Sequence, residues 1–201
     1  MIRIRCMFEA AICRSELDDY VRVLELSIVG YTEDGEEIVM GRMGAELLQL
    51  QAAAEDGQEL ISICDNHSGN LVDLYTSLFN EDYDLQEEFD IDAATNQVLF
   101  LWQSAFHPKL RPYQSSILNT LPDMFGCDCA MVMRRTASDL DDRELVDLGF
   151  KRIAGTEYLF RHLGLMNEYS RVHPRGIETA AEFQAFDEDA DWITENWDEE
   201  F

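Results

Sequence analysis

The pattern of apolar and polar positions near the N-terminus predicts a β-hairpin. Residues 21–31 are rich in residues that favour strands, and apolar and polar side chains partly alternate along them. Residues 33–36 (Glu-Asp-Gly-Glu) then supply a turn, and residues 37–43 return to a strand-like composition. Two such runs joined by a short glycine-containing turn are typical of neighbouring antiparallel strands.

The next part of the chain has patterns that favour helices. Residues 45–55 combine leucines with an alanine triplet and are followed by Gly57, which predicts a helix. Residues 60–64 are short and apolar and predict a strand or a buried turn. Residues 70–79 place their large apolar side chains on one face, as an amphipathic helix does. Residues 80–96 are polar and acidic and predict a surface loop.

The second half of the chain is predicted to alternate strands and helices. Residues 98–106 are almost uniformly apolar, as in a strand that is covered on both faces. His107-Pro108 ends this strand, because the residue before a proline avoids the helical conformation. The elements predicted after it are a helix at 112–121, a strand at 129–133, a helix at 139–148 opened by Ser138 or Asp139 and ended by Gly149, and a strand at 157–163. The first two of these strands should run parallel through the helix between them.

These elements predict an α+β domain with a mixed, twisted sheet flanked by helices. A length of 201 residues suits one domain with an appendage, and an apolar content of 46% suffices for a normal core. We therefore expect a domain over residues 1–163 and a separate acidic, aromatic segment over residues 164–201.

Negative charge is unevenly distributed along the chain. There are 41 acidic residues against 15 basic ones, a formal net charge of −26. Residues 16–96 hold 21 acidic residues and two arginines, and residues 164–201 hold 11 acidic residues and two arginines. Residues 97–163 are neutral, with eight acidic and eight basic residues. The acidic excess therefore flanks a neutral central stretch.

The net negative charge limits the kinds of molecule that this chain can bind. A chain with a pI near 4.2 repels nucleic acid and anionic lipid, so we expect no direct nucleic-acid partner and no membrane association. Basic proteins, including those that themselves bind nucleic acid, are the partners that such a charge attracts. A protein that is acidic only for solubility is the alternative.

The cysteines indicate a reducing compartment. The chain has five cysteines, an odd number at irregular spacing, and the sequence before them does not have the composition of a secretory signal. We therefore expect a cytoplasmic protein without disulfides. Cys127 and Cys129 are too close together for a two-cysteine zinc knuckle, and no metal site is expected.

The neutral stretch 97–163 resembles part of a known enzyme family. Its order is strand, arginine-containing loop, helix, strand, helix, the tripeptide Leu148-Gly149-Phe150, and strand. This order resembles the cofactor-binding half of the GNAT family of N-acetyltransferases, and the resemblance extends over about residues 20–163. It implies a GNAT-like fold for this region. An unrelated α+β domain with the same order of elements is the alternative.

The resemblance also implies a cofactor site. In the family, the loop after the strand holds the pyrophosphate of an acyl-CoA with its backbone N–H groups and the helix N-terminus. Arg111 matches the first residue of the motif, whereas Pro112, Gln114 and Ser116 stand where glycines or alanine would be. Pro112 removes a backbone donor, and Gln114 places a side chain where a phosphate would sit. The residues implied in binding acetyl-CoA are Lys109, Arg111, Gln114, Ser115 and Ser116.

Two catalytic groups that the family often uses are missing. The strand at 98–106 carries Gln103 but no carboxylate to act as general base, and Leu145 stands where a tyrosine often protonates the leaving thiolate. The loss of such a group costs about 10²–10⁴ in rate. We therefore expect a catalytically degenerate protein; the alternative is an active acetyl-CoA-dependent N-acetyltransferase that acts on a basic amine. The side chains that could replace the missing groups are Glu157, Tyr158, Tyr113 and His107.

The C-terminal segment 164–201 combines acids with large apolar side chains. Tryptophan prefers a buried or interfacial place, so the segment either packs back on its own domain or docks on a partner. In the second case the aromatic anchors would enter a basic groove, as in inhibitors with DNA-like charge that occupy nucleic-acid-binding sites. The predicted anchors are Trp192, Trp197 and Phe201.

Overall fold

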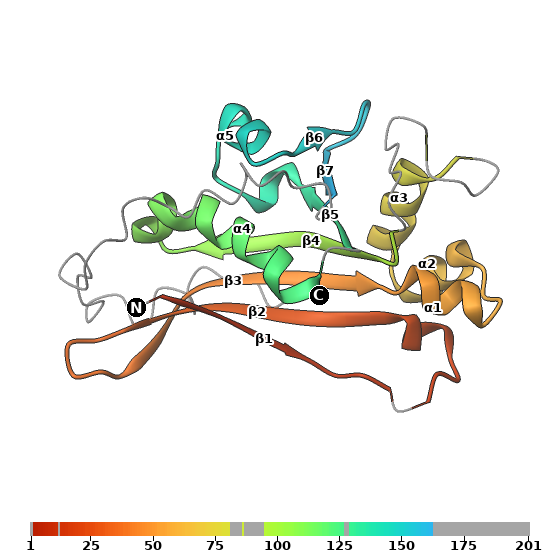
Figure 1. Ribbon diagram of the computed structural model, residues 1–201, viewed down its shortest axis with the longest axis horizontal. Coiled ribbons are helices and arrows are strands. Elements are labelled where there is room, and N and C mark those ends of the chain that lie inside the picture. The colour runs from red at the N-terminus through yellow and green to blue at the C-terminus, as the bar shows by residue number, and fades with distance from the viewer. Residues whose placement is uncertain (1, 12, 81–85, 87–94, 127–128, 163–201) are drawn as a thin grey trace.

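One mixed sheet organises the part of the chain that the structure describes (Figure 1). The computed structural model describes residues 2–11, 13–80, 86, 95–126 and 129–162. Seven strands lie side by side in the order β1-β2-β3-β4-β5-β7-β6. They are β1 (Arg3–Phe8), β2 (Val21–Tyr31), β3 (Glu37–Leu48), β4 (Gln97–Phe106), β5 (Cys129–Arg134), β6 (Lys151–Arg152) and β7 (Tyr158–His162). β4 and β5 are parallel, and the other neighbouring pairs are antiparallel.

Helices pack on both faces of this sheet, which makes the fold α+β as predicted. Side chains of α4 and α5 join the core on one face, and side chains of α1, α2 and α3 join the core on the other. In Figure 1, α1 and α2 gather at the end of the sheet where β3 ends. The helices are η1 (Leu17–Tyr20), α1 (Leu50–Glu55), α2 (Leu60–His67), α3 (Gly69–Leu78), η3 (Pro108–Tyr113), α4 (Gln114–Phe125), η4 (Arg135–Ala137) and α5 (Asp142–Asp147), where η marks a 3-10 helix.

The predicted hairpin is confirmed as β2 and β3, but its second strand is longer than predicted. The turn contains Gly35 at φ 82°, a left-handed conformation that favours glycine. β3 continues to Leu48, so the helix predicted over 45–55 is wrong in its first part, and α1 begins only at Leu50. Residues 45–48 pair with β2 on one side and β4 on the other, and this pairing overrides the helix propensity of the leucines.

The segment 60–64, predicted as a strand or a buried turn, is instead the first part of helix α2. Ile63 and Cys64 are fully buried in the core, whereas Asp65 and Asn66 are exposed. The apolar run is therefore the buried face of a helix, and five residues are too few to distinguish that pattern from a strand.

The helix predicted over 70–79 is confirmed as α3. Ser68 caps it, because its hydroxyl oxygen accepts the N–H of Leu71 at 3.3 Å. The loop predicted over 80–96 lies mostly outside the described residues. Strand β1, in which basic and apolar residues alternate, is an addition that the sequence pattern did not predict.

The parallel pairing expected for the strands at 98–106 and 129–133 is confirmed. β5 pairs with β4 only along Gln97–Leu101, whereas β3 pairs with the other edge of β4 along almost all of 98–106. The chain after β5 turns into η4, and the hydroxyl of Ser104 on β4 donates to the carbonyl of Ala137 at 2.8 Å. The two parallel strands therefore separate, and η4 lies against β4 beyond the separation.

Helix α4 begins later than predicted. The prediction of a helix over 112–121 fails at its start, because residues 108–113 form the 3-10 helix η3. Pro108 and Pro112 carry no N–H group, so this stretch cannot make a full ladder of helical hydrogen bonds. Its geometry places the first α-helical residue at Gln114.

Helix α5 is shorter than the predicted 139–148. Its cap is Asp141, which forms a capping box with the first turn, and not Ser138 or Asp139. Gly149 ends the helix as predicted, at φ 86°. The strand predicted over 157–163 is confirmed as β7, which lies between β5 and β6.

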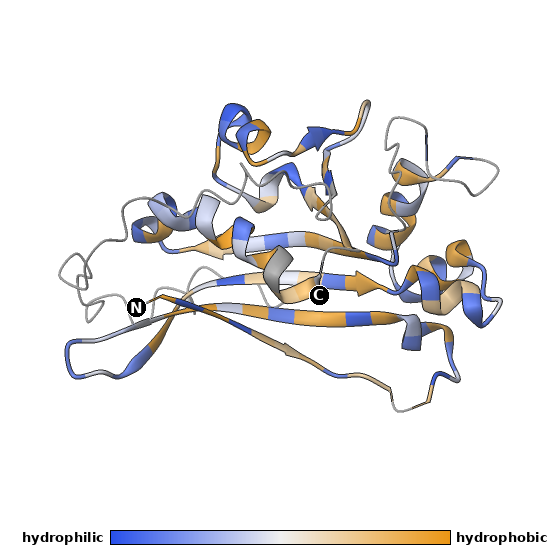
Figure 2. Ribbon diagram, viewed as in Figure 1, coloured by the Kyte–Doolittle hydropathy of each residue, from blue (hydrophilic) through white to orange (hydrophobic). Residues whose placement is uncertain are grey.

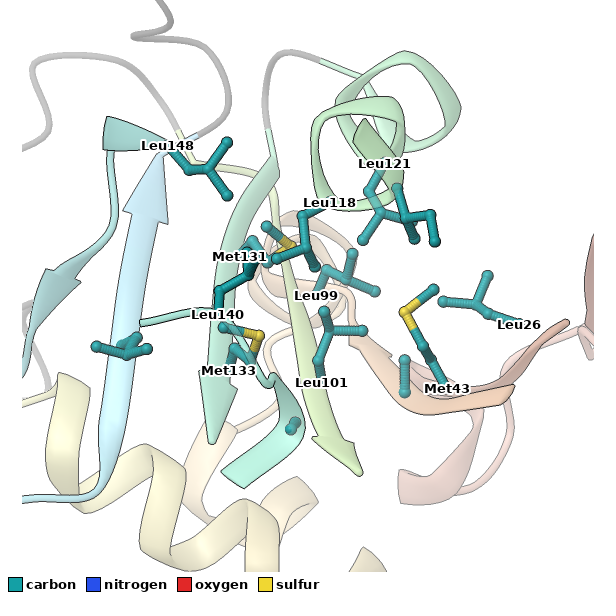
Figure 3. Close-up of a cluster of buried hydrophobic side chains, with 14 of the residues drawn as sticks. Leu26, Met43, Leu99, Leu101, Leu118, Leu121, Met131, Met133, Leu140 and Leu148 are labelled. Atoms are coloured by element: carbon teal, nitrogen blue, oxygen red, sulfur yellow. The ribbon is translucent and has the colours of Figure 1, made fainter. Parts of the chain in front are cut away.

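The larger core lies between the sheet and helix α4. Figure 3 shows Leu118 and Leu121 of α4 directed toward Leu99 of β4 and Met131 of β5. All four side chains are at most 2% exposed. Figure 2 shows polar residues interspersed among apolar ones along β2. The predicted uniform burial of β4 holds only for its first half, since residues 102–105 are partly exposed.

No helix among the described residues combines the length and the apolar character needed to cross a membrane.

Candidate functional site

The cofactor loop implied by the resemblance is a 3-10 helix, not an open loop. η3 packs its Leu110 into the core with no exposed surface, and His107 caps it by accepting the backbone N–H of Lys109 at Nδ1, at 3.1 Å. Pro112 lies inside η3. The backbone that would hold a phosphate is thus folded onto itself as a short helix.

Gln114, the first residue of α4, is held by the segment that precedes α5. Its side chain is 2% exposed. Its Nε2 donates to Asp139 Oδ2 at 2.9 Å, and its Oε1 accepts the backbone N–H of Asp139 at 3.2 Å. Two hydrogen bonds therefore join the start of α4 to the chain between η4 and α5, with a carboxylate beside the helix N-terminus.

Arg111 is engaged by a second carboxylate. Its Nη2 and Nη1 donate to Glu144 Oε2 at 2.7 Å and Glu144 Oε1 at 3.3 Å, a bidentate pair with each side chain about two-fifths exposed. Hydrogen bonding to Arg111, and then to the backbone N–H of Asp141, holds the pKa of Glu144 below its ordinary value. Glu144 is thereby fixed as an anion facing η3.

The other residues implied in cofactor binding contribute less to this arrangement. Ser115 and Ser116 are half-buried on the first turn of α4, and the carbonyl of Ser116 accepts the hydroxyl of Thr120 at 2.8 Å. Lys109 is exposed on η3. Arg111 and Gln114 are joined directly, because the backbone N–H of Gln114 donates to the carbonyl of Arg111. Their side chains bind carboxylates of α5 and of the segment before it.

The four catalytic candidates do not form one site. Tyr113 packs against the core on the α4 face, whereas Tyr158 is 4% exposed in the core on the α3 face. Burial raises the pKa of Tyr158, which disfavours the phenolate. His107 is 7% exposed at the start of η3. Glu157 is exposed, and its carboxylate pairs with Arg134 at 3.3 Å.

Arg134 fixes the surroundings of Tyr158. Its Nη2 donates to Asn70 of α3 at 2.7 Å, and its Nε pairs with Glu157. Tyr158 itself packs edge-on against Phe100, with ring centroids 5.8 Å apart. These contacts tie β5, β7 and α3 together around the buried ring of Tyr158.

The two carboxylates at the α4 start, Asp139 and Glu144, are the residues that sequence reasoning missed. The spacing of Asp141 and Glu144 is a readable capping-box signal. Nothing in the spacing, however, indicates that Glu144 also reaches Arg111, 33 residues earlier in the chain. The predicted anchors Trp192, Trp197 and Phe201 lie outside the described residues.

Among the described residues, no group of three histidine, cysteine or acidic side chains is arranged to hold a metal ion. No family model, curated protein or solved structure matches this chain.

Proposed function

We propose that this chain is an acidic, GNAT-like protein that acts by binding a basic protein and not by transferring acyl groups. The observation that carries the proposal is that two side chains at the start of α4 are already bound to carboxylates of the same chain. Gln114 is bonded to Asp139, and Arg111 is paired with Glu144. Two of the five residues that the resemblance implies in binding acetyl-CoA are thus bound to carboxylates of the same chain.

The electrostatics at this position oppose a phosphate ligand. A pyrophosphate at the start of α4 would meet the carboxylates of Asp139 and Glu144. It would have to replace the bidentate pair of Arg111, whose charge-assisted hydrogen bonds are about twice as strong as neutral ones. Pro112 lacks the backbone N–H group that would donate to a phosphate, and the buried side chain of Gln114 occupies space that a phosphate would need.

The likeness to the family remains part of the proposal. It is supported by the parallel pairing of β4 and β5 through α4, which the resemblance requires. It is also supported by the turn at Gly149 between α5 and the last strands. A fold of this kind does not by itself establish an activity.

Charge defines the proposed partner. A net charge of −26 gives fast, salt-sensitive association with a basic surface, such as the nucleic-acid-binding site of another protein. Trp192, Trp197 and Phe201 supply the apolar anchors that charge alone lacks. The chain would then act as an inhibitor or regulator with DNA-like charge. A location in the reducing cytoplasm is part of the proposal, because an odd number of cysteines at irregular spacing does not suggest a disulfide framework.

An acetyl-CoA-dependent N-acetyltransferase is the second candidate. It is favoured by the partial exposure of the pair between Arg111 and Glu144, which is 40% and 38% exposed and so accessible to a competing anion. In that case the acidic surface would attract a basic amine substrate.

Recovery of a partner at two salt concentrations tests the proposal. The full chain is immobilised and exposed to an extract of its native host at about 0.05 M and about 0.5 M salt. A basic protein should be retained at low salt and released at high salt. It should also be lost when Trp192, Trp197 and Phe201 are all replaced by alanine.

The matched control is Phe8→Ala, which removes an aromatic side chain that is 53% exposed on β1. It should leave retention unchanged. Retention of no basic protein, or retention that ignores both salt and the three aromatic residues, would refute the partner-binding function.

A further inference from the structure

A histidine between two carboxylates joins three elements on the α1–α3 face of the sheet. His67, in the last turn of α2, places Nδ1 3.1 Å from Asp18 Oδ1 of η1. Its other ring nitrogen, Nε2, lies 3.4 Å from Glu46 Oε1 of β3. Asn66 adds a hydrogen bond from Nδ2 to the same Asp18 oxygen at 3.1 Å. No part of the proposed function uses this cluster.

The geometry selects the charged form of His67. A carboxylate accepts hydrogen bonds and donates none, so each ring nitrogen that faces one must carry a proton. Neutral imidazole has one N–H group and one lone pair, and the lone pair would point at an anion. Both contacts are satisfied only by the imidazolium ion.

Because Glu46 is buried, the proton on His67 stabilises the packing of α2 against β3. Glu46 is 8% exposed, and its Oε2 has no hydrogen-bond partner in the part of the chain that the structure describes. If His67 became neutral, this carboxylate would be left in the core without a cation, which is strongly unfavourable. The hydrogen bond to Glu46 raises the pKa of His67 most, and the negative charge of Glu46 and the contact with Asp18 raise it further. Burial lowers this pKa, but by less.

The neighbouring charged groups do not replace these partners. On α2 itself, the thiol of Cys64 is buried, and burial followed by the charge of Glu46 raises its pKa to about 12, so it stays neutral. Asp19 of η1 binds the backbone N–H groups of Ser15 and Glu16. Asp56, which follows α1, binds Arg14.

On α3, which packs against α2, Asp73 is exposed, and its carbonyl accepts the hydroxyl groups of Thr76 and Ser77. The two carboxylates on His67 lie on opposite ring nitrogens and cannot converge on one ion, so the cluster is not a metal site.

We propose that Asp18, His67 and Glu46 form a proton-operated clamp that fastens α2 to η1 and β3. Protonated His67 closes the clamp. Loss of the proton leaves Glu46 buried without a cation, and α2 with η1 separates from the sheet by local opening while β4, β5 and α4 stay folded. The clamp is therefore a pH-sensitive device that loosens one helical layer as the pH rises.

The direction of the pH dependence follows from the raised pKa. A base with a higher pKa in the closed state binds its proton more tightly there. The contribution of the clamp is complete below the ordinary histidine value of about 6.5 and is lost as the pH rises through the pKa of the closed state. Between these two values the equilibrium constant for opening rises about tenfold per pH unit.

Amide hydrogen exchange of the full chain, corrected for the intrinsic rate, tests the clamp. The amides of α2 and η1 should show constant protection below about pH 6.5, lose it about tenfold per pH unit up to the pKa of His67 in the closed state, and level off above that pKa. The amides of α4 in the same sample serve as the control and should not change. In His67→Gln the protection of α2 should be low and independent of pH.

Direct titration of His67 by NMR in the unmodified chain provides a readout that needs no variant. Its pKa should lie above about 6.5 and should fall toward that value in Glu46→Gln, which keeps the size of the side chain and removes its charge. Protection of α2 that stays flat from acid to alkaline pH, or a His67 pKa at or below about 6.5, would overturn the proposal.

Discussion

Trp102 lies against the sheet at a position where only glycine leaves room. A Cβ atom added to Gly44 would lie 2.3 Å from Trp102 Cζ2 and 2.6 Å from Cη2, far inside van der Waals contact. Here the pairing of β3 with β4 shifts by one residue between Gly44 and Ala45, as in a β-bulge. The packing of β3 on β4 thus depends on one missing methyl group.

Gly44→Ala should destabilise the protein by about 1–3 kcal/mol, because the indole must leave its place and the strand must shift. Denaturant unfolding measures the loss, and tryptophan fluorescence should change with it. The control is Gly69→Ala at the first position of α3, where nothing lies within 4 Å of the added Cβ. That change should be neutral or slightly stabilising. Equal effects of the two substitutions would contradict the packing argument.

Single residues also mark the limit of what the sequence could predict. Arg161 on β7 is 2% exposed, and burial lowers its pKa to about 10. It donates to Asn119 of α4 at 3.0 Å and lies over the Phe150 ring. The sequence around Arg161 does not indicate which residue will bind its buried guanidinium group, because Asn119 lies 42 residues away in the chain.

At the scale of elements, the link between α4 and the chain before α5 depends on Gln114. Its two hydrogen bonds to Asp139 are made by a side chain that is 2% exposed. Gln114→Ala should cost about 1–3 kcal/mol of unfolding free energy, since both bonds are lost and a buried space opens. The comparison is Gln51→Ala on α1, which breaks an exposed hydrogen bond of 2.8 Å to Glu55 and should change stability by less than about 0.5 kcal/mol. A loss at Gln114 as small as that at Gln51 would show that the link is not structural.

Elements with strong local patterns could be predicted, and those set by pairing could not. The hairpin of β2 and β3, the buried strands β4 and β5, helix α3 and the glycine stop at Gly149 follow from periodicity and turn residues. The end of β3 at Leu48 does not, because strand pairing on both sides replaced a local helix signal. Helix α2 was missed since one turn of helix and a short strand look alike in sequence.

The candidate site was predictable only as a list of residues. Arg111 and Gln114 were identified from the resemblance, but their carboxylate partners come from a distant segment. The clamp at His67 was missed for the same reason, because Asp18 and Glu46 are separated from it by 49 and 21 positions. Contacts of this kind arise from the sheet topology and leave no local spacing.

At the scale of the whole molecule, the negative charge should work against the folded state. Residues 16–96 carry 21 acidic residues and two arginines, so like charges are brought together on folding. Added salt should therefore raise the melting temperature between about 0.01 M and 0.5 M, by about 2–4 °C for each kcal/mol of relieved repulsion. Thermal unfolding monitored by circular dichroism measures it. Near the pI of about 4.2 the salt effect should shrink, and a melting temperature that falls with salt at neutral pH would contradict the expectation.

Titration of the full chain with acetyl-CoA by calorimetry tests most directly whether the start of α4 can hold an acyl-CoA, as an acyltransferase must. Because Arg111 and Gln114 are already bound to Glu144 and Asp139, we expect no binding heat with acetyl-CoA at about 1 mM. The free energy of binding would then be less favourable than about −4 kcal/mol. Arg111→Ala provides the site variant, and Arg143→Ala on the exposed face of α5 provides the matched control. Micromolar binding that is lost in Arg111→Ala and kept in Arg143→Ala would contradict the account and establish a functional acyl-CoA site.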